Sequence, residues 1–163
     1  MKEEILLKKI TCLLLSGITA LSLLSGCGED VATDDYSDYK NSLNNFFDAV
    51  TTLDEEINAL DPEDDDSISE LFVYLDELED QFEYFAEIEV PDAYIVTESL
   101  ADEAYDYMKQ ANEYFKASFS DTSYNQYTYE AGLECYSRAN KRVQYVISIL
   151  HGELPEDENI SYE

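Results

Sequence analysis

Three basic residues gather within five positions of a chain that is otherwise strongly acidic. Arg138, Lys141 and Arg142 are half of the six Lys and Arg residues that follow residue 26. Arginine suits bidentate contact with a carboxylate or a phosphate, because its guanidinium presents a planar fork of N–H donors. Tyr136 and Tyr145 add aromatic rings to the same stretch. The spacing predicts a ligand-binding site for a small anion, built from Arg138, Arg142, Tyr136 and Tyr145.

The same residues also fit a helix that is stabilised by its own ion pairs. Glu130, Glu134, Arg138 and Arg142 follow one another at steps of four, so they share one helix face. A Glu that lies four residues before an Arg is in the favourable order. In this interpretation the cations form a ladder of side-chain pairs and also attract acids on neighbouring helices. Both interpretations stay open from the sequence.

The stretch from Asp61 to Asp66 holds five carboxylates in six residues and suggests calcium. The calcium-binding loop of an EF-hand needs Gly at its sixth position and Glu at its twelfth. A register that starts at Asp61 places Asp66 and Phe72 there, and one that starts at Asp64 places Ile68 at a ligand position. A solvated acidic turn is favoured, with a loose cation site as the alternative. We expect no metal centre and no cofactor.

Residue types give little support to catalysis. The single histidine, His151, falls near the predicted end of a helix, where the helix dipole favours a cation. The Glu-x-x-His pattern of di-iron bundles does not occur in the sequence. Pairs of carboxylates are numerous by chance in so acidic a chain, and a catalytic acid also needs a pocket that shifts its pKa. We expect no catalytic residues and no enzymatic activity.

The most specific chemistry in the chain ends at Cys27. An apolar run from Ile10 to Leu24 follows Lys8 and Lys9, and Ser25-Gly26-Cys27 closes it. A basic start, an apolar middle and small residues at the end are typical of a secretory signal peptide. The run of about 15 residues is shorter than the roughly 20 that a membrane-spanning helix needs. A cleaved signal peptide is therefore favoured over a retained membrane helix.

Leu24-Ser25-Gly26-Cys27 resembles the lipobox of bacterial lipoproteins. The resemblance implies cleavage before Cys27, a diacylglycerol thioether on its sulfur, and lipid anchoring at the extracytoplasmic face of the cell membrane. Two acyl chains hold a protein well, because each buried CH₂ contributes roughly 0.8 kcal/mol. Residues 1–26 are then the signal peptide and residues 27–33 a lipidated tether, of which the last six reach roughly 20 Å when extended.

Composition limits the partners of the remaining chain. Residues 27–163 carry a formal charge of −30, which excludes nucleic acid as a partner, because phosphate contacts need Lys and Arg. All 14 Tyr and all 7 Phe lie in this part, and such aromatic content argues against disorder. Cys135 is the thiol left after cleavage and lipidation, so no internal disulfide is expected. It is interpreted as a small buried side chain, with a thiol activated by Arg138 as the alternative.

Hydrophobic periodicity predicts two helices rich in large side chains. The stripe of the first helix is Tyr36, Tyr39, Leu43, Phe46, Phe47, Val50, Leu53, Ile57 and Leu60. Asp61-Pro62 ends it, because the residue before proline avoids the helical region. The second helix is predicted to have an N-cap at Ser67 and a capping box with Glu70, and Val90-Pro91-Asp92 breaks it. Its stripe is Ile68, Leu71, Phe72, Leu75, Leu78, Phe82, Phe85 and Ile88.

Two further helices carry smaller apolar residues. The third starts near Asp92 or Ala93, and its stripe is Val96, Leu100, Ala104, Met108, Ala111 and Phe115. The fourth runs from about Tyr124 to Leu150 and stops at His151-Gly152. Small residues allow these two helices to approach closely, while the aromatic rings of the first two fill the facing space. The pattern predicts an all-α, antiparallel up-down four-helix bundle over residues 34–152 and an acidic, flexible tail at 153–163.

Residues 27–163 as a whole resemble small acidic helical lipoproteins of Gram-positive cell envelopes, a resemblance that carries over no functional residues. We expect a membrane-anchored, non-enzymatic module that binds another envelope protein. The alternative is a site for a small ligand or a cation, at the cluster on the fourth helix or at the acidic loop. The numerous tyrosines either rim the bundle with their hydroxyls in water or form a recognition surface.

Overall fold

The computed structural model describes residues 34–61, 64, 66–119 and 124–153. The expected signal peptide, the lipidation site at Cys27, the tether and all but the first residue of the tail lie outside these described residues. Within them the chain forms helices and no strand, so the predicted all-α class is confirmed. The long helices are α2 (Asp34–Ala59), α3 (Ser67–Glu87), α4 (Val96–Ser118) and α5 (Gln126–Leu150), and the 3₁₀ helix η2 (Asp92–Tyr94) precedes α4.

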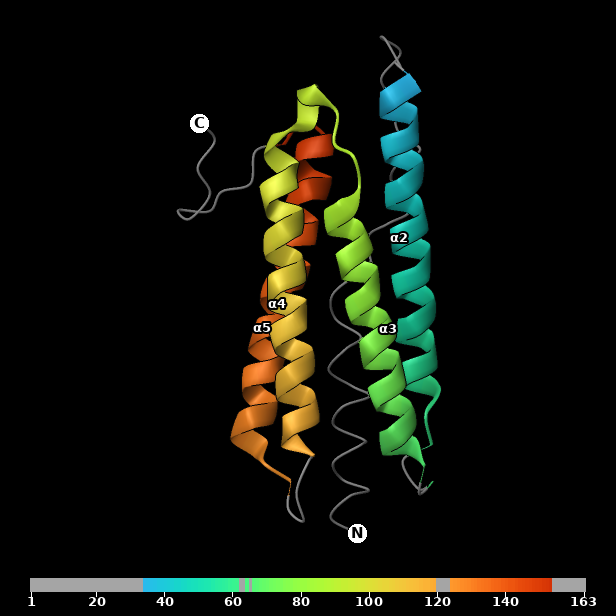
Figure 1. The fold of residues 1–163 in the computed structure, drawn as a ribbon, viewed down its shortest axis with the longest axis vertical. Coiled ribbons are helices and arrows are strands. Elements are labelled where there is room, and N and C mark those ends of the chain that lie inside the picture. The colour runs from blue at the N-terminus through green and yellow to red at the C-terminus, as the bar shows by residue number, and fades with distance from the viewer. Residues whose placement is uncertain (1–33, 62–63, 65, 120–123, 154–163) are drawn as a thin grey trace.

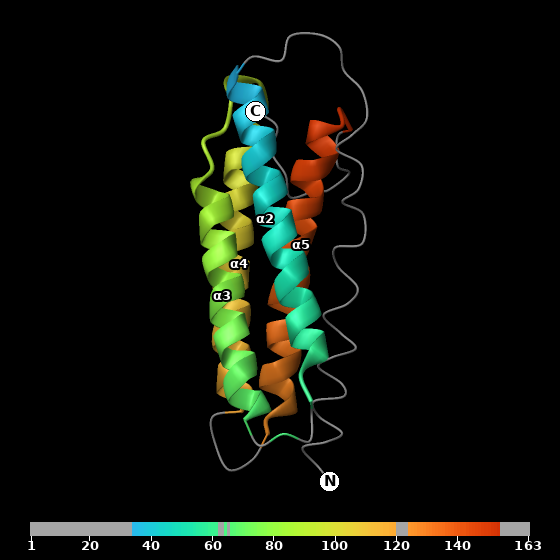
Figure 2. The same cartoon turned by 90° about the vertical axis from the view of Figure 1, so that its right-hand side faces the viewer.

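The four long helices run up and down along the long axis of the bundle, as predicted (Figures 1 and 2). The end where α2 and α4 begin and α3 and α5 finish is called the Tyr94 end. The end where α2 and α4 finish and α3 and α5 begin is called the Tyr127 end. Among the described helices, none has the length and apolarity needed to cross a membrane.

The ends of α5 and α3 show which of the expected capping and stop residues act in the structure. Asn125 caps α5, because its Oδ1 accepts a hydrogen bond from the Thr128 N–H at 3.2 Å. Gly152 follows α5 with a φ of 76°, in the left-handed region that favours glycine. The predicted capping box of α3 is wrong: Ser67 is its first residue rather than its cap. The Ser67 hydroxyl donates instead to the Asp61 carbonyl and ties the turn to the helix.

Large aromatic side chains fill the space between α2 and α3. Phe46 lies fully buried, with its ring stacked on Phe85 at 4.5 Å between centroids and edge-on to Phe82 at 5.4 Å. Burial of such rings is the main favourable contribution to folding, and each ring pair adds about 0.5–1.5 kcal/mol beyond the area it buries. The predicted role of the large stripe residues is confirmed here.

Small residues bring α4 and α5 together, and this pair has the most extensive close backbone approach in the bundle. A Cβ added to Gly132 would lie 2.8 Å from the Phe115 ring and 3.3 Å from the Ala111 carbonyl oxygen. Ala104 and Ala139 are fully buried on the two helices. The predicted close approach of the third and fourth helices is therefore confirmed, and Gly132 is the point where a side chain has no room.

Candidate functional site

The basic residues singled out from the sequence form a ladder with two tyrosines across the outer side of the α4/α5 pair. The Arg138 and Arg142 guanidinium groups of α5 each lie 5.7 Å from the ring centroid of Tyr107 on α4. Tyr145 has Arg142 at 5.8 Å and the Lys141 ammonium at 5.3 Å. Cations at these distances are attracted to the ring faces. These five residues are called the arginine–tyrosine ladder.

The two guanidinium groups of the ladder already have carboxylate partners. Arg142 is nearly buried, with a side chain 10% exposed, and its Nε donates to Glu103 Oε2 of α4 at 2.5 Å. Arg138 is 53% exposed and donates to Glu134 Oε1 at 2.5 Å, one turn earlier on α5. Arg138 pairs along α5 with Glu134, as the interpretation as side-chain pairs on one helix predicted, whereas Arg142 pairs with an acid of the neighbouring helix α4, which the same interpretation also predicted. An anion that bound here would have to compete with Glu134 for Arg138.

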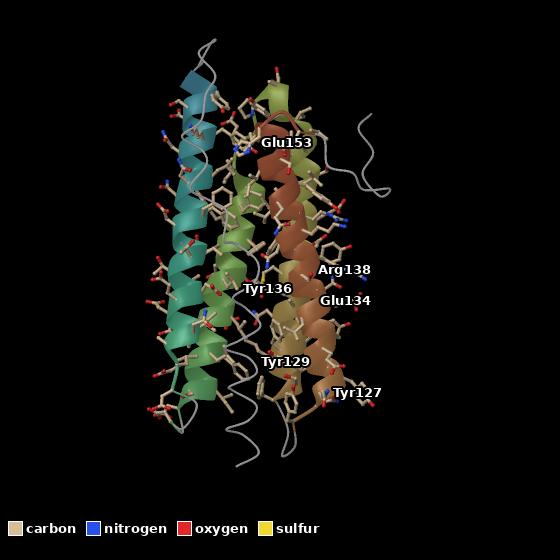
Figure 3. The ribbon with its side chains drawn as sticks, turned by 180° about the vertical axis from the view of Figure 1, so that it is seen from behind. Tyr127, Tyr129, Glu134, Tyr136, Arg138 and Glu153 are labelled. Carbon is tan, nitrogen blue, oxygen red and sulfur yellow. The ribbon has the colours of Figure 1, made fainter. Side chains whose placement is uncertain are left out.

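Tyr136 does not join the other predicted site residues. Its side chain lies in the core, on the opposite side of α5 from Arg138 and Glu134 (Figure 3). Burial raises the pKa of Tyr136 to about 12, with a smaller contribution from the negative charge of Asp54 on α2. A hydrogen bond with Asn140 acts against this shift. The structure therefore brings together Arg138, Arg142 and Tyr145 and places Tyr136 toward α2.

Sequence reasoning missed Tyr107 and Glu103 as members of this cluster. Both lie on α4 at a spacing of four, so one helix face presents them together. The spacing of Glu103 and Tyr107 was visible in the sequence. The register of α4 against α5, which brings these two residues to Arg138 and Arg142, was not. The register is a tertiary property, which the spacing of residues along one helix does not contain.

The remaining sequence candidates lie apart from the ladder or stay on the surface. Asp61, Asp64 and Asp66 are exposed at the Tyr127 end, and His151 is exposed after α5. Cys135 is half-buried, and burial is the largest cause of its raised pKa, which outweighs the opposing charge of Arg138. A raised pKa keeps the thiol protonated and unreactive. The described stretches hold no group of three His, Cys, Asp or Glu side chains placed to bind a metal.

A second aromatic cluster joins three helices at the Tyr127 end. Phe119, just after α4, lies 6.1 Å from the ring of Phe72 on α3, 5.7 Å from Tyr124 and 6.4 Å from Tyr129 on α5. Tyr129 is buried, while Phe72, Phe119 and Tyr124 are each only half-buried. Tyr127 projects away from the cluster at the start of α5 (Figure 3). Through these three half-buried rings, the edge of the hydrophobic core reaches the protein surface at the Tyr127 end.

The two clusters differ in chemistry. The charged groups of the arginine–tyrosine ladder already have partners, whereas the rings of the aromatic cluster at the Tyr127 end are only partly covered. Comparison with protein-family models, with curated proteins and with solved structures finds no match to this chain. The geometry of these residues and the motif before Cys27 are therefore the basis for a function.

Proposed function

We propose that this chain is a lipid-anchored protein of the extracytoplasmic membrane face whose helical bundle is a non-enzymatic protein-interaction module. The observation that carries the anchor is Leu24-Ser25-Gly26-Cys27 after an apolar run that starts at Ile10. A charge of −30 on residues 27–163 repels anionic lipid headgroups, so the acyl chains rather than the bundle surface would hold the protein.

Exposed apolar and aromatic side chains support the interaction role. Val73, Ile95 and Tyr127 are the most exposed of the large hydrophobic side chains in the described part. Tyrosine is enriched at recognition surfaces, where its ring is buried by the partner and its hydroxyl makes a hydrogen bond. The commitment of Arg138 and Arg142 to Glu134 and Glu103 favours this role over a small-anion site.

Lipid attachment is tested by substituting Cys27→Ser and, as the matched control, Cys135→Ser. Cells that express each full chain are labelled with an alkyne fatty acid, and the chain is then partitioned between detergent and water. We expect the wild type and Cys135→Ser to carry label and to enter the detergent phase. Cys27→Ser is expected to lose the label and to stay unprocessed. Equal labelling of Cys27→Ser, or an unlabelled wild type, overturns the proposal.

The second candidate function is binding of a small anion at Arg138, Arg142 and Tyr145, with Tyr107 as a further contact, or of a cation at the acidic loop. The observation in its favour is the gathering of three cations over two tyrosine rings. Phosphate, citrate and calcium are the probes. Specific binding raises the unfolding temperature, because a ligand that binds only the folded state adds RT ln(1 + [L]/Kd). A rise with phosphate that Arg138→Met abolishes would favour this function.

A further inference from the structure

The second half of α5 and the segment after it carry opposite charges. Residues 135–152 contain Arg138, Lys141 and Arg142 and no Asp or Glu, which is the longest run without an acid after residue 26. The next eleven residues, 153–163, contain five acids and no Lys or Arg. A chain with a net charge of −29 thus places three of its cations directly before an acidic segment. Electrostatic complementarity favours contact between the two.

The end of α5 turns the chain away from the helix axis. The N–H groups of Gly152 and Glu153 donate to the carbonyls of Ile149 and Ser148, each at 2.9 Å. Together with the φ of 76° at Gly152, these two bonds form a Schellman motif. The second bond holds the Glu153 backbone against the Ser148 carbonyl, so the acidic segment starts against the last turns of α5.

This turn is fixed on the side of α5 that carries the exposed cations. Lys141, Tyr145 and Ser148 follow one another at steps of four and three, so they share one side of the helix. Lys141 is exposed, and its ammonium lies 5.3 Å from the Tyr145 ring centroid. Arg138, also exposed, lies one turn before Lys141, and Figure 3 shows Glu153 beyond Arg138 toward the Tyr94 end.

The acidic segment has the length needed to bring its carboxylates to these cations. The run 156–158, Glu-Asp-Glu, follows Glu153 by three to five residues, or about 10–17 Å of extended chain. Lys141 and Arg138 lie seven and ten residues before Ser148, or about 10–15 Å along a helix. So short a connection keeps the acids at an effective concentration on the order of mM near the cations, and weak ion pairs are then enough.

The present partner of Arg138 is a weak competitor for a second carboxylate. Arg138 Nη2 donates to Glu134 Oε1, and both side chains of this pair are more than half exposed. Ion pairs between exposed groups contribute little, and a guanidinium has five N–H donors to share. Arg142 is different, because its nearly buried side chain is held by Glu103. The exposed part of the arginine–tyrosine ladder is therefore Arg138 and Lys141.

We propose that the acidic tail, residues 153–163, folds back along α5 and pairs its Glu-Asp-Glu run with Arg138 and Lys141. The tail is then a ligand of the ladder within the same chain, and it covers the exposed cations against other anions. This inference goes beyond the proposed function and does not need the lipid at Cys27.

The first test is carbodiimide crosslinking of the full chain, extracted from cells in a mild detergent. The reagent activates a carboxyl group, and a lysine amine in contact with it displaces the activating group and forms an amide with no spacer. Mass spectrometry then identifies the joined peptides. Lys109 is the internal control, because it is exposed like Lys141 but lies over the ring of Tyr105, which contacts Glu83 of α3.

We expect residues 156–158 to join Lys141 at least about fivefold more often than Lys109, and high salt to reduce this preference. Arg138→Met should also reduce it, because one of the two cations that hold the run is lost. Equal reaction at Lys141 and Lys109, or no reaction at Lys141, would overturn the proposal. Crosslinks found mainly in covalent dimers would overturn the assignment to the same chain.

The second test is the sign of a change in unfolding temperature. Glu156→Gln/Glu158→Gln removes two charges from the tail, and Asp38→Asn/Asp48→Asn removes two from exposed positions of α2. Loss of acids relieves self-repulsion in so acidic a chain, so the α2 variant should keep or raise the unfolding temperature. The tail variant should instead lose about 2 °C, because it loses ion pairs. A rise in both variants would overturn the proposal.

Discussion

The α2/α3 pair and the α4/α5 pair belong to one bundle but are held together in different ways. Between α2 and α3 the rings of Phe46, Phe82 and Phe85 occupy the interior. Between α4 and α5 the interior is lined by Gly132 and alanines, and the backbones come close together. At the edge of this pair, the Arg142 guanidinium of α5 lies 5.7 Å from the ring centroid of Tyr107 on α4.

This difference teaches that large aromatic side chains pack in the core between α2 and α3, whereas in the α4/α5 pair two of them, Tyr107 and Tyr145, contact basic residues at the edge. Large side chains separate α2 from α3 and are consumed in the core. Small side chains let α4 and α5 approach closely, and Tyr107, Tyr145 and the three basic residues form the arginine–tyrosine ladder at the edge of this pair. The predictions below test whether the two pairs depend on different interactions, from the largest expected effect to the smallest.

Phe46→Ala tests the aromatic interior of α2/α3. Removal of a fully buried ring leaves a cavity between Phe82 and Phe85, and such substitutions cost about 3–5 kcal/mol in the free energy of unfolding. Urea denaturation followed by circular dichroism measures the loss. The control is Tyr127→Ala, which removes an aromatic ring from the surface and is expected to change stability by less than about 0.5 kcal/mol. A similar loss in both variants would contradict the assignment of Phe46 to the core.

Arg142→Met tests the outer clamp of α4/α5. The substitution leaves Glu103 without its partner, and loss of a hydrogen bond between charged groups costs about 1.5–3 kcal/mol. Arg138→Met is the matched control, because Arg138 contacts the same Tyr107 ring from an exposed position, where ion pairs contribute little. We expect the urea midpoint to fall for Arg142→Met and to remain nearly unchanged for Arg138→Met. Equal shifts would show that burial does not distinguish the two arginines.

Gly132→Ala tests the close approach of α4 and α5. Overpacking costs about 1–3 kcal/mol, which exceeds the gain of about 1 kcal/mol from replacing glycine in a helix. The clash is with a buried ring, Phe115, and with the Ala111 carbonyl, so we expect a net loss of about 1 kcal/mol. Phe115→Leu in the same chain should remove part of the Gly132→Ala effect in a double-mutant cycle. A more stable Gly132→Ala would show that the seam can widen.

The pH dependence of stability tests two carboxylates, the half-buried Asp54 on α2 and Asp76 on α3, which pairs with Lys116 of α4. Burial, with a smaller effect of Glu55, raises the pKa of Asp54 above its ordinary 3.8. A raised pKa in the folded state means that ionised Asp54 opposes folding, so its contribution improves as the pH falls from neutral toward 3.8. The Lys116 hydrogen bond lowers the pKa of Asp76, and the stability that Asp76 provides is lost as the pH falls further, through that lowered value.

Thermal unfolding between pH 7 and pH 3 measures both contributions. Asp54→Asn should flatten the rise in unfolding temperature on acidification and leave the fall at lower pH intact. Asp48→Asn, on the same helix and exposed, makes the same change in net charge and should reproduce the wild-type profile. Identical profiles for the two variants would place the pH dependence in overall charge rather than in Asp54.

Much of the fold could be predicted because it depends on local spacing. The apolar stripes gave the number of helices and their order, and Gly152 marked the end of α5. The Glu134–Arg138 pair was predictable because both residues lie on one helix, one turn apart. The start of α3 was not predictable, because Ser67 and its neighbours suit either an N-cap or the first turn of a helix. The hydrogen bond from the Ser67 hydroxyl to the Asp61 carbonyl decides between the two.

The candidate site was only half predictable for a related reason. Tyr136 lies two positions from Arg138 and Tyr145 lies three positions from Arg142, yet Tyr145 joins the ladder and Tyr136 enters the core. Their places depend on which side of α5 faces α2 and α4. Tyr107 came from another helix altogether, 31 positions before Arg138.

The amino-acid sequence by itself determined the helical class, the acidic charge and the motif at Cys27, because each of these depends on residue type and near-neighbour spacing. Tertiary structure alone decided which tyrosines meet the arginines and which aromatic residues reach the surface at the Tyr127 end. Those contacts require two helices at a particular distance and register, and at Gly132 α5 lies so close to α4 that a Cβ would meet the Phe115 ring at 2.8 Å.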